Sequence, residues 1–173
     1  MAVNLINSDD INIVQTNDDI KMNLSEERVD QLSVQMIKAI MSEDYTINGV
    51  STIEMLPLDT VNTQKGTKLT VENGGVKIGK GINYVLASGN VYWYTNVQNR
   101  ETITYIYKND SNQSTTNCYY TSNQEHTTLP MVIIPVQEGD IINLRVQAQG
   151  AASPLPVIKS YGTGTFLTVI GYK

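Results

Sequence analysis

The last apolar stretch of the chain, Phe166–Tyr172, follows Gly162 and Gly164 and constrains the fold more than any other segment. Its bulky and β-branched side chains suit a strand, and apolar residues occur at both parities of the strand alternation. A strand of this kind has to be covered on both faces. Because chain ends usually fray unless they are held, we predict that this strand lies inside a sheet. We expect one face in the core and the other at a subunit interface.

From about Tyr45 onward, apolar residues recur with a period of two, and turn-forming residues interrupt the pattern. The clearest turn is Asn73-Gly74, a pair preferred in two-residue hairpin loops. Further turns are expected at 88–90, 109–112 and 138–140. Many short strands separated by turns predict an antiparallel β-sandwich or jelly roll. The expected strands are Thr46–Met55, Lys68–Glu72, Val76–Ile78, Ile82–Ala87, Val91–Thr95, Thr102–Lys108, Asn117–Thr121, Met131–Ile134, Ile141–Gln147 and Phe166–Tyr172.

One segment, from about Ser25 to Ser42, favours a helix. Ser25 suits the N-cap, and Glu26 and Glu27 place negative charge in the first turn, where the helix dipole stabilises it. Apolar residues follow at helical spacing along one stripe, which needs a partner. The run is too short to establish a coiled coil, and a three-helix bundle or packing against a domain would both cover it. The residues expected at a trimer interface here are Val29, Leu32, Met36 and Ile40.

A short repeat precedes this segment, since the sequence pattern of Ser8–Ile13 recurs at Asn17–Met22. Each copy reads as an Asp-containing turn followed by alternating apolar residues. Two short strands cannot bury an apolar face alone, so they need copies from other chains or, alternatively, form a local hairpin packed on the globular domain. We therefore assign residues 1–44 to an N-terminal attachment and trimerisation segment and residues 45–173 to a β-sandwich head domain.

Composition excludes several classes of partner. The formal net charge is −5 and no cluster of Lys and Arg is present, which argues against nucleic acid. No apolar run approaches the ~20 residues that cross a bilayer, and no secretory signal pattern begins the chain, so we expect cytoplasmic synthesis without membrane insertion. His126 and Cys118 are the sole histidine and cysteine, too few for a zinc site, and no catalytic motif surrounds them. We expect no enzyme activity, no metal and no cofactor.

The aromatic residues are ten Tyr, one Trp and one Phe, and four of the tyrosines stand out. Tyr92 and Tyr94 share one face of a predicted strand, and Tyr105 and Tyr107 share one face of another. If these strands pair, the rings form a ladder on which sugar rings could stack. The alternative is a subunit interface or a core layer, which also favours Tyr and Trp. We predict the four tyrosines as ligand contacts.

The segments Gly81–Gly89, Glu138–Val146 and Gly162–Tyr172, together with the N-terminal repeat, resemble those of a known group. The chain is similar to bacteriophage fibre and baseplate proteins of the receptor-binding type, with a TNF/C1q-like jelly-roll head. The resemblance implies a homotrimer in which the terminal strand lies near the three-fold axis. It thereby adds Phe166 and Ile170 to the expected trimer interface.

This resemblance implies a structural virion protein, exposed on the particle surface. The N-terminal segment would attach to other tail, baseplate or capsid proteins, and the head would bind host cell-surface saccharide through many weak sites acting together. One alternative is a virion protein that decorates the particle without binding a ligand. Another is a polysaccharide-degrading enzyme, which the lack of a recognisable pair of catalytic carboxylates disfavours.

Overall fold

The chain divides into two compact units, Met1–Val34 and Gln35–Lys173. In the first unit, β1 (Ile11–Thr16) and β2 (Asp19–Leu24) form an antiparallel hairpin, so the two copies of the repeat pair with each other. The computed structural model describes residues 11–16, 19–24, 34–94, 101–119, 124–150, 154–160 and 164–173.

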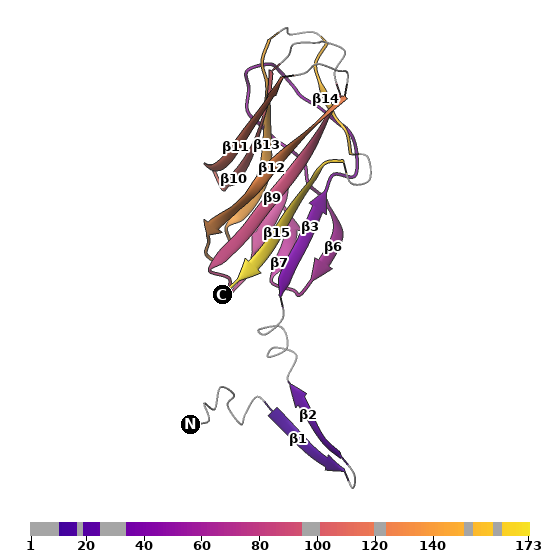
Figure 1. Cartoon of the computed structure of the whole chain (residues 1–173), viewed down its shortest axis with the longest axis vertical. Helices are drawn as coiled ribbons and strands as arrows, with labels where there is room; N and C mark the ends of the chain where they lie inside the picture. Colours follow the sequence, from indigo (N-terminus) through magenta and orange to yellow (C-terminus); the bar gives the residue numbers. More distant parts are fainter. Residues whose placement is uncertain are drawn as a thin grey trace. The chain divides into compact units, whose positions relative to one another are not determined.

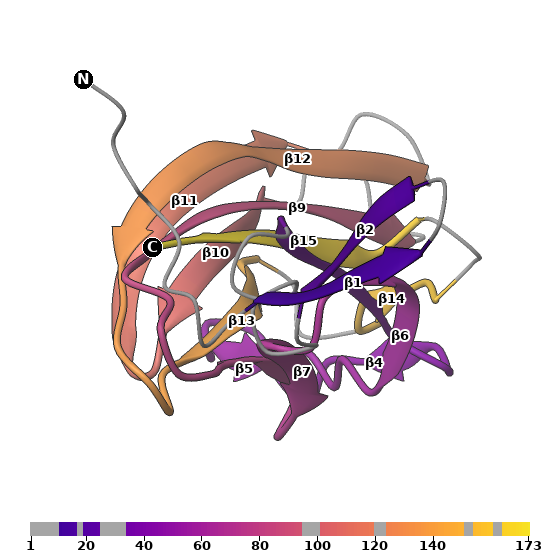
Figure 2. The same cartoon turned by 90° about the horizontal axis from the view of Figure 1, so that it is seen from below.

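The second unit contains two antiparallel sheets, which Figures 1 and 2 show as two layers. The seven-stranded sheet, here called the β15 sheet, has the order β4 (Tyr45–Thr46), β14 (Val157–Ile158), β9 (Tyr84–Tyr94), β15 (Phe166–Tyr172), β3 (Gln35–Ile40) and β6 (Thr60–Lys65), with β12 (Gln124–Pro135) also beside β9. The six-stranded sheet, here called the β13 sheet, has the order β11 (Ser111–Tyr119), β10 (Glu101–Lys108), β13 (Ile141–Ala148), β8 (Gly75–Ile78) and β7 (Leu69–Glu72), with β5 (Glu54–Met55) also beside β13.

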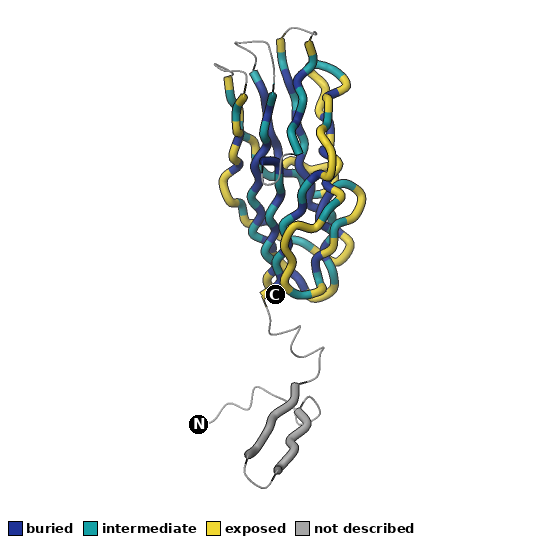
Figure 3. The backbone as a smooth tube through the Cα atoms, turned by 90° about the vertical axis from the view of Figure 1, so that its right-hand side faces the viewer, coloured by how far each residue is buried: buried dark blue, intermediate teal, exposed yellow. Residues whose placement is uncertain are grey.

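The core lies between these sheets and follows from the period-two alternation of the strands. In β15, Leu167 and Val169 are fully buried, whereas Phe166 and Ile170 on the opposite face are partly exposed. In Figure 3, buried residues alternate with less buried ones along the central strands. The largest fully buried side chains are Trp93, Ile37, Met41, Ile47, Leu56, Leu58, Leu69, Ile78, Ile106 and Leu129.

The predicted β-sandwich and its clearest turn are confirmed. Strands β7 and β8 form a hairpin whose loop is Asn73-Gly74, and both residues have positive φ, 50° and 74°. This is the left-handed conformation that Asn and Gly tolerate in two-residue hairpin loops. The turn predicted at 138–140 is also present, with Gly139 at φ 90°.

The predicted helix is wrong over residues 35–40, which form β3 between β15 and β6. Gln35, Ile37 and Ala39 face the core, and the residues between them face outward, so this short segment satisfies a period of two as well as a helical stripe. Pairing with β15 selects the strand over the helix. The part described by the structure contains no helix, and hence none that could cross a membrane. The β unit begins at Gln35 rather than at residue 45, and residues 25–33, including Val29 and Leu32, lie outside the described residues.

The turn predicted at 88–90 is wrong, because β9 runs without interruption from Tyr84 to Tyr94. Gly89 faces inward, and a Cβ atom there would lie 2.8 Å from Leu144 Cδ2 of the opposite sheet. The glycine therefore permits close packing of the two sheets. The strand predicted at Thr46–Met55 is also wrong, since β4 and β5 lie in different sheets and a loop joins them.

Candidate functional site

The four tyrosines predicted as ligand contacts fall into two separate pairs. Tyr92 and Tyr94 lie on β9 in the β15 sheet, whereas Tyr105 and Tyr107 lie on β10 in the β13 sheet. Strand β10 pairs with β11 and β13 and not with β9, so the expected cross-strand ladder between the pairs does not form.

Tyr105 and Tyr107 belong to a braced cluster on the outer face of the β13 sheet. The Tyr105 side chain is 8% exposed, and its hydroxyl donates to Gln147 Oε1 at 2.7 Å. The two tyrosine rings meet edge to face at 5.9 Å, and the Arg145 guanidinium lies 4.3 Å from the centre of the Tyr107 ring. These contacts use the ring faces and hydroxyl within the protein, so the pair is poorly placed to contact a ligand.

Tyr92 and Tyr94 instead line a hollow of about 640 Å³ together with Asp44, Gln124 and Lys159. The Tyr92 hydroxyl donates to Gln124 Oε1 at 2.6 Å, which fixes one side of the hollow. Its volume lies in the range of about 300–1,000 Å³ that is typical of small-molecule sites. The hollow combines aromatic rings, an amide and two charged groups, so it offers ring faces and hydrogen-bonding groups side by side.

A stack of two rings supports one wall of this hollow. The register places His126 opposite Tyr92, and the two rings are parallel within 11° at a centroid distance of 4.3 Å. Asn90 Nδ2 lies 3.0 Å from His126 Nδ1 and also donates to the Gly164 carbonyl, while Asn90 Oδ1 accepts from the Thr128 hydroxyl at 2.8 Å. Asn90 Nδ2 can donate to His126 Nδ1 as well as to the Gly164 carbonyl when the histidine ring carries its proton on Nε2.

An ion pair also lines the hollow. Lys159 Nζ donates to Asp44 Oδ2 at 2.7 Å, and it lies 5.2 Å from the centre of the Tyr94 ring. Asp44 Oδ1 accepts from the backbone N–H of Ser160 at 2.8 Å and from its hydroxyl at 3.1 Å. The Lys159 and Ser160 hydrogen bonds hold the pKa of Asp44 below its ordinary value, and the Asp44 hydrogen bond raises the pKa of Lys159.

Short strand pairing brings this ion pair together across 115 positions of the chain. Strand β14 pairs with β4, with Ile158 opposite Tyr45, so the adjoining residues Lys159 and Asp44 become neighbours. Lys159 N–H also donates to the Tyr92 carbonyl at 2.9 Å, which extends the wall toward β9. Neither the ion pair nor the position of His126 was predicted, because both depend on which distant strands pair.

Glu54 braces the loop behind Asp44. Its carboxylate accepts from the Tyr45 hydroxyl at 2.7 Å, from Asn48 N–H at 2.8 Å and from Gly49 N–H at 3.1 Å. Burial alone would raise the pKa of Glu54, but these hydrogen bonds hold it below its ordinary value. Burial and the Glu54 hydrogen bond raise the pKa of Tyr45 to about 12.

The predicted interface residues that the structure describes share the outer face of the β15 sheet. Ile170 lies opposite Met36, and Phe166 lies opposite Ile40. The apolar row through Met36 and Ile170 continues across β9 and β12, because Leu86 pairs with Ile170 on one side and with Ile133 on the other. The next row on this face contains Lys38, whose Nζ lies 4.1 Å from the centre of the Phe166 ring. The most exposed apolar side chains of the face are Ile133 at 68%, Met131 at 57%, Tyr84 at 51% and Tyr172 at 45%.

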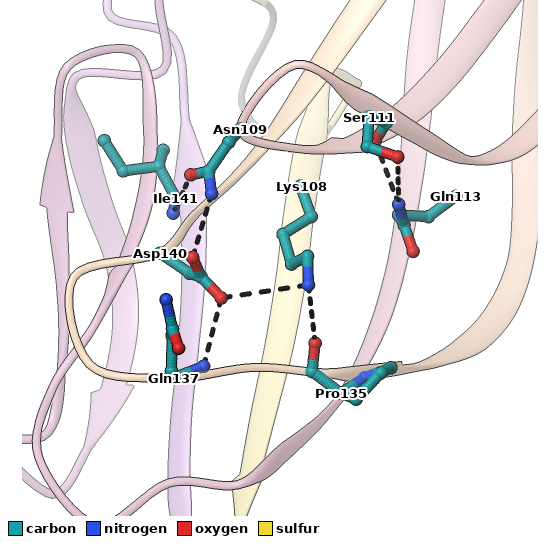
Figure 4. A network of polar contacts seen from close by, with 8 residues as sticks. All are labelled: Lys108, Asn109, Ser111, Gln113, Pro135, Gln137, Asp140 and Ile141. Atoms are coloured by element: carbon teal, nitrogen blue, oxygen red, sulfur yellow. Dashed lines mark hydrogen bonds and ion pairs between the residues drawn. The ribbon is translucent and has the colours of Figure 1, made fainter.

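A polar network joins two turns at the Lys108 end of β10 (Figure 4). Asp140 Oδ1 accepts from Asn109 Nδ2 at 2.8 Å, and Asp140 Oδ2 accepts from Gln137 N–H at 3.0 Å. Lys108 Nζ lies 3.9 Å from the same carboxylate and donates to the Pro135 carbonyl at 3.1 Å. Asp140 is 7% exposed, and its hydrogen bonds to Asn109 and Gln137 hold the turn at Asn109 against the turn that precedes β13.

Metal ligands do not gather in the described part of the chain, where no three His, Cys, Asp or Glu side chains are placed to hold an ion. Cys118 is partly buried on β11, and burial raises the pKa of its thiol, which favours the protonated, less nucleophilic form.

Comparison with known proteins shows the fold but no sequence family. The sequence matches no family model and no curated protein. Among solved structures, murine APRIL at pH 8.5 is similar with a TM-score of 0.59 and 10% identity, over 81% of this chain and 100% of that chain. The vertex protein P5 of PRD1 is similar with a TM-score of 0.55 and 11% identity, over 95% of this chain and 82% of that chain. The second unit is therefore a TNF-like jelly-roll β-sandwich, as the resemblance implied.

The Glu54 brace gives a prediction with a defined pH dependence. Replacing Glu54 with Gln removes the charged acceptor from Asn48 and Gly49 N–H and should lower the free energy of unfolding by about 1–3 kcal/mol at neutral pH. Since the folded-state pKa of Glu54 is depressed, its contribution is complete above its ordinary pKa and is lost as the pH falls through the folded-state value.

Urea unfolding of wild type and Glu54→Gln should therefore give curves that differ at pH 7 and converge at strongly acidic pH. Asp59→Asn serves as the control, because Asp59 bonds Ser42 in an exposed setting and should change stability less. A difference for Glu54→Gln that persists undiminished in acid would contradict the charge-based role.

Proposed function

We propose that the protein is a structural virion component of a bacterial virus, a homotrimer whose β-sandwich head is exposed on the particle and binds saccharide on the host surface. The TNF-like fold, and the likeness over 95% of this chain to a phage vertex protein, support the virion part. The hollow at Tyr92 and Tyr94 is the observation that carries the host-binding part. The proposal includes no enzymatic activity.

The homotrimer is supported by the outer face of the β15 sheet. A row of four apolar residues crosses four neighbouring strands in register, namely Ile133, Leu86, Ile170 and Met36. Exposed apolar surface of this extent marks an interaction site in soluble proteins. A second copy of the chain is the occupant proposed here, because three-fold packing would also cover the outer face of the terminal strand.

Attachment to the particle is assigned to the N-terminal unit. Its β1–β2 hairpin is a two-stranded sheet, which is marginally stable alone in water. Pairing with tail, baseplate or capsid proteins, or with other copies of the chain, would supply the missing partner. Three heads on each trimer and many trimers on each particle would then turn weak saccharide binding into firm attachment.

Tyr94→Ala should weaken binding of the trimer to host cell-wall saccharide by about tenfold, because it removes a ring face from the hollow. Tyr92→Ala should act similarly and should also release His126 from its stack. Binding is measured on a glycan array or by cell-binding of the labelled full-length protein.

Tyr107→Ala is the matched control, since Tyr107 lies in the other sheet. Equal binding by wild type and Tyr94→Ala trimers would contradict the assignment of the hollow. If the wild-type trimer bound neither saccharide nor cells, the remaining function would be decoration of the particle. Release of reducing ends from wall material would show that the protein is an enzyme.

Ile170→Asp should convert the trimer into monomers, because a carboxylate would replace an apolar side chain at the proposed interface. Light scattering coupled to size exclusion gives the mass, and circular dichroism shows that the sheet is kept. Met55→Asp is the control, because Met55 is 43% exposed on β5 of the other sheet. A trimer of unchanged stability carrying Ile170→Asp would rule out this interface.

A further inference from the structure

We infer that the hollow selects uncharged saccharides and that the Asp44–Lys159 ion pair is the feature that excludes anionic ones. This inference rests on the proposed function, since it names the class of saccharide that the same hollow takes. It separates neutral glycans from uronate-rich and phosphate-containing polymers.

The described wall of the hollow has no net charge. Its lining residues include one carboxylate, Asp44, and one ammonium, Lys159, and these lie 2.7 Å apart. The Asp44 and Lys159 side chains are 43% and 32% exposed, so a ligand in the hollow can reach both.

The ion pair is held in place from the carboxylate side. Two hydrogen bonds from Ser160 fix Asp44 Oδ1, and β4–β14 pairing fixes the backbone on either side. An anionic group that approaches Lys159 Nζ therefore meets the Asp44 carboxylate at short range and is repelled by it. The net charge of −5 on the chain adds repulsion at longer range.

A hydroxyl group meets no such penalty. It can donate to Asp44 Oδ2 and accept from the Lys159 ammonium without separating the pair, because Lys159 has three N–H donors and Asp44 Oδ2 has a second lone pair beside the one that accepts from Lys159. Adjacent hydroxyls of a neutral sugar can thus bridge Asp44 and Lys159 while the C–H face of its ring contacts Tyr92 or Tyr94. The lining offers apolar rings and a neutral pair of hydrogen-bonding groups, which is the chemistry of an uncharged sugar.

The test compares three immobilised polymers with the full-length trimer, namely a neutral hexose polysaccharide, a uronic acid polysaccharide and a phosphodiester-linked teichoic acid. Wild type should bind the neutral polymer with an affinity that changes little with salt, and it should not bind the two anionic polymers. Asp44→Asn frees Lys159 and should raise binding of both anionic polymers by about tenfold or more.

Two further variants sharpen the test. Glu72→Gln is the matched control, because it makes the same change in net charge as Asp44→Asn. Glu72 lies on the β7–β8 hairpin, where it pairs with Lys77 at 2.8 Å. This variant should not gain anion binding. Lys159→Gln leaves Asp44 uncompensated and should gain binding to a cationic glucosamine polymer. Both sites are exposed, and circular dichroism verifies folding.

The outcomes separate this inference from the proposed function. Preference of wild type for an anionic polymer, or an equal gain by Asp44→Asn and Glu72→Gln, would overturn the inference and leave saccharide binding intact. Failure of wild type to bind any of the polymers or host cells would overturn the proposed function, and the inference with it.

Discussion

Strand β15 pairs with β9 on one side and with β3 on the other, and this double pairing is the constraint on which the sandwich depends. It joins the last residues of the chain to the first strand of the β unit. Its inner side chains, Leu167 and Val169, are fully buried between the sheets, so the end of the chain cannot fray without opening the core. The alternation that buries these residues also sends Phe166 and Ile170 to the outer face.

The same sheet carries both proposed surfaces at different places along β9. The apolar row crosses this strand at Leu86, whereas the hollow begins at Tyr92. At about 3.4 Å per residue, the two positions lie about 20 Å apart along the strand. The row itself therefore lies clear of the hollow, whereas Phe166, which is also predicted at the interface, pairs with Asn90, two residues from Tyr92.

Much of the sandwich could be predicted from local patterns. The Asn73-Gly74 hairpin follows from residues that tolerate positive φ, and the bounds of β15 follow from its apolar run. The helix prediction failed at Gln35–Ile40 because six residues satisfy two periods equally, and only pairing with β15 decides between them. The turn predicted at Gly89 failed because glycine occurs in turns and also where two sheets approach closely, and Gly89 has the second role.

The candidate site was predictable only in part, because its members come from distant strands. Tyr92 and Tyr94 could be placed on one face from alternation alone. Their separation from Tyr105 depends on the strand order of the sandwich, which local sequence does not specify. The Asp44–Lys159 pair and the His126 stack depend on that same order.

The most direct test of the account is the mass of the wild-type protein in solution, measured by sedimentation over a range of concentrations. We expect three times the mass of one chain, because other copies would cover the outer face of the β15 sheet. A mass of one chain at all concentrations, with the apolar row open to solvent, would contradict it.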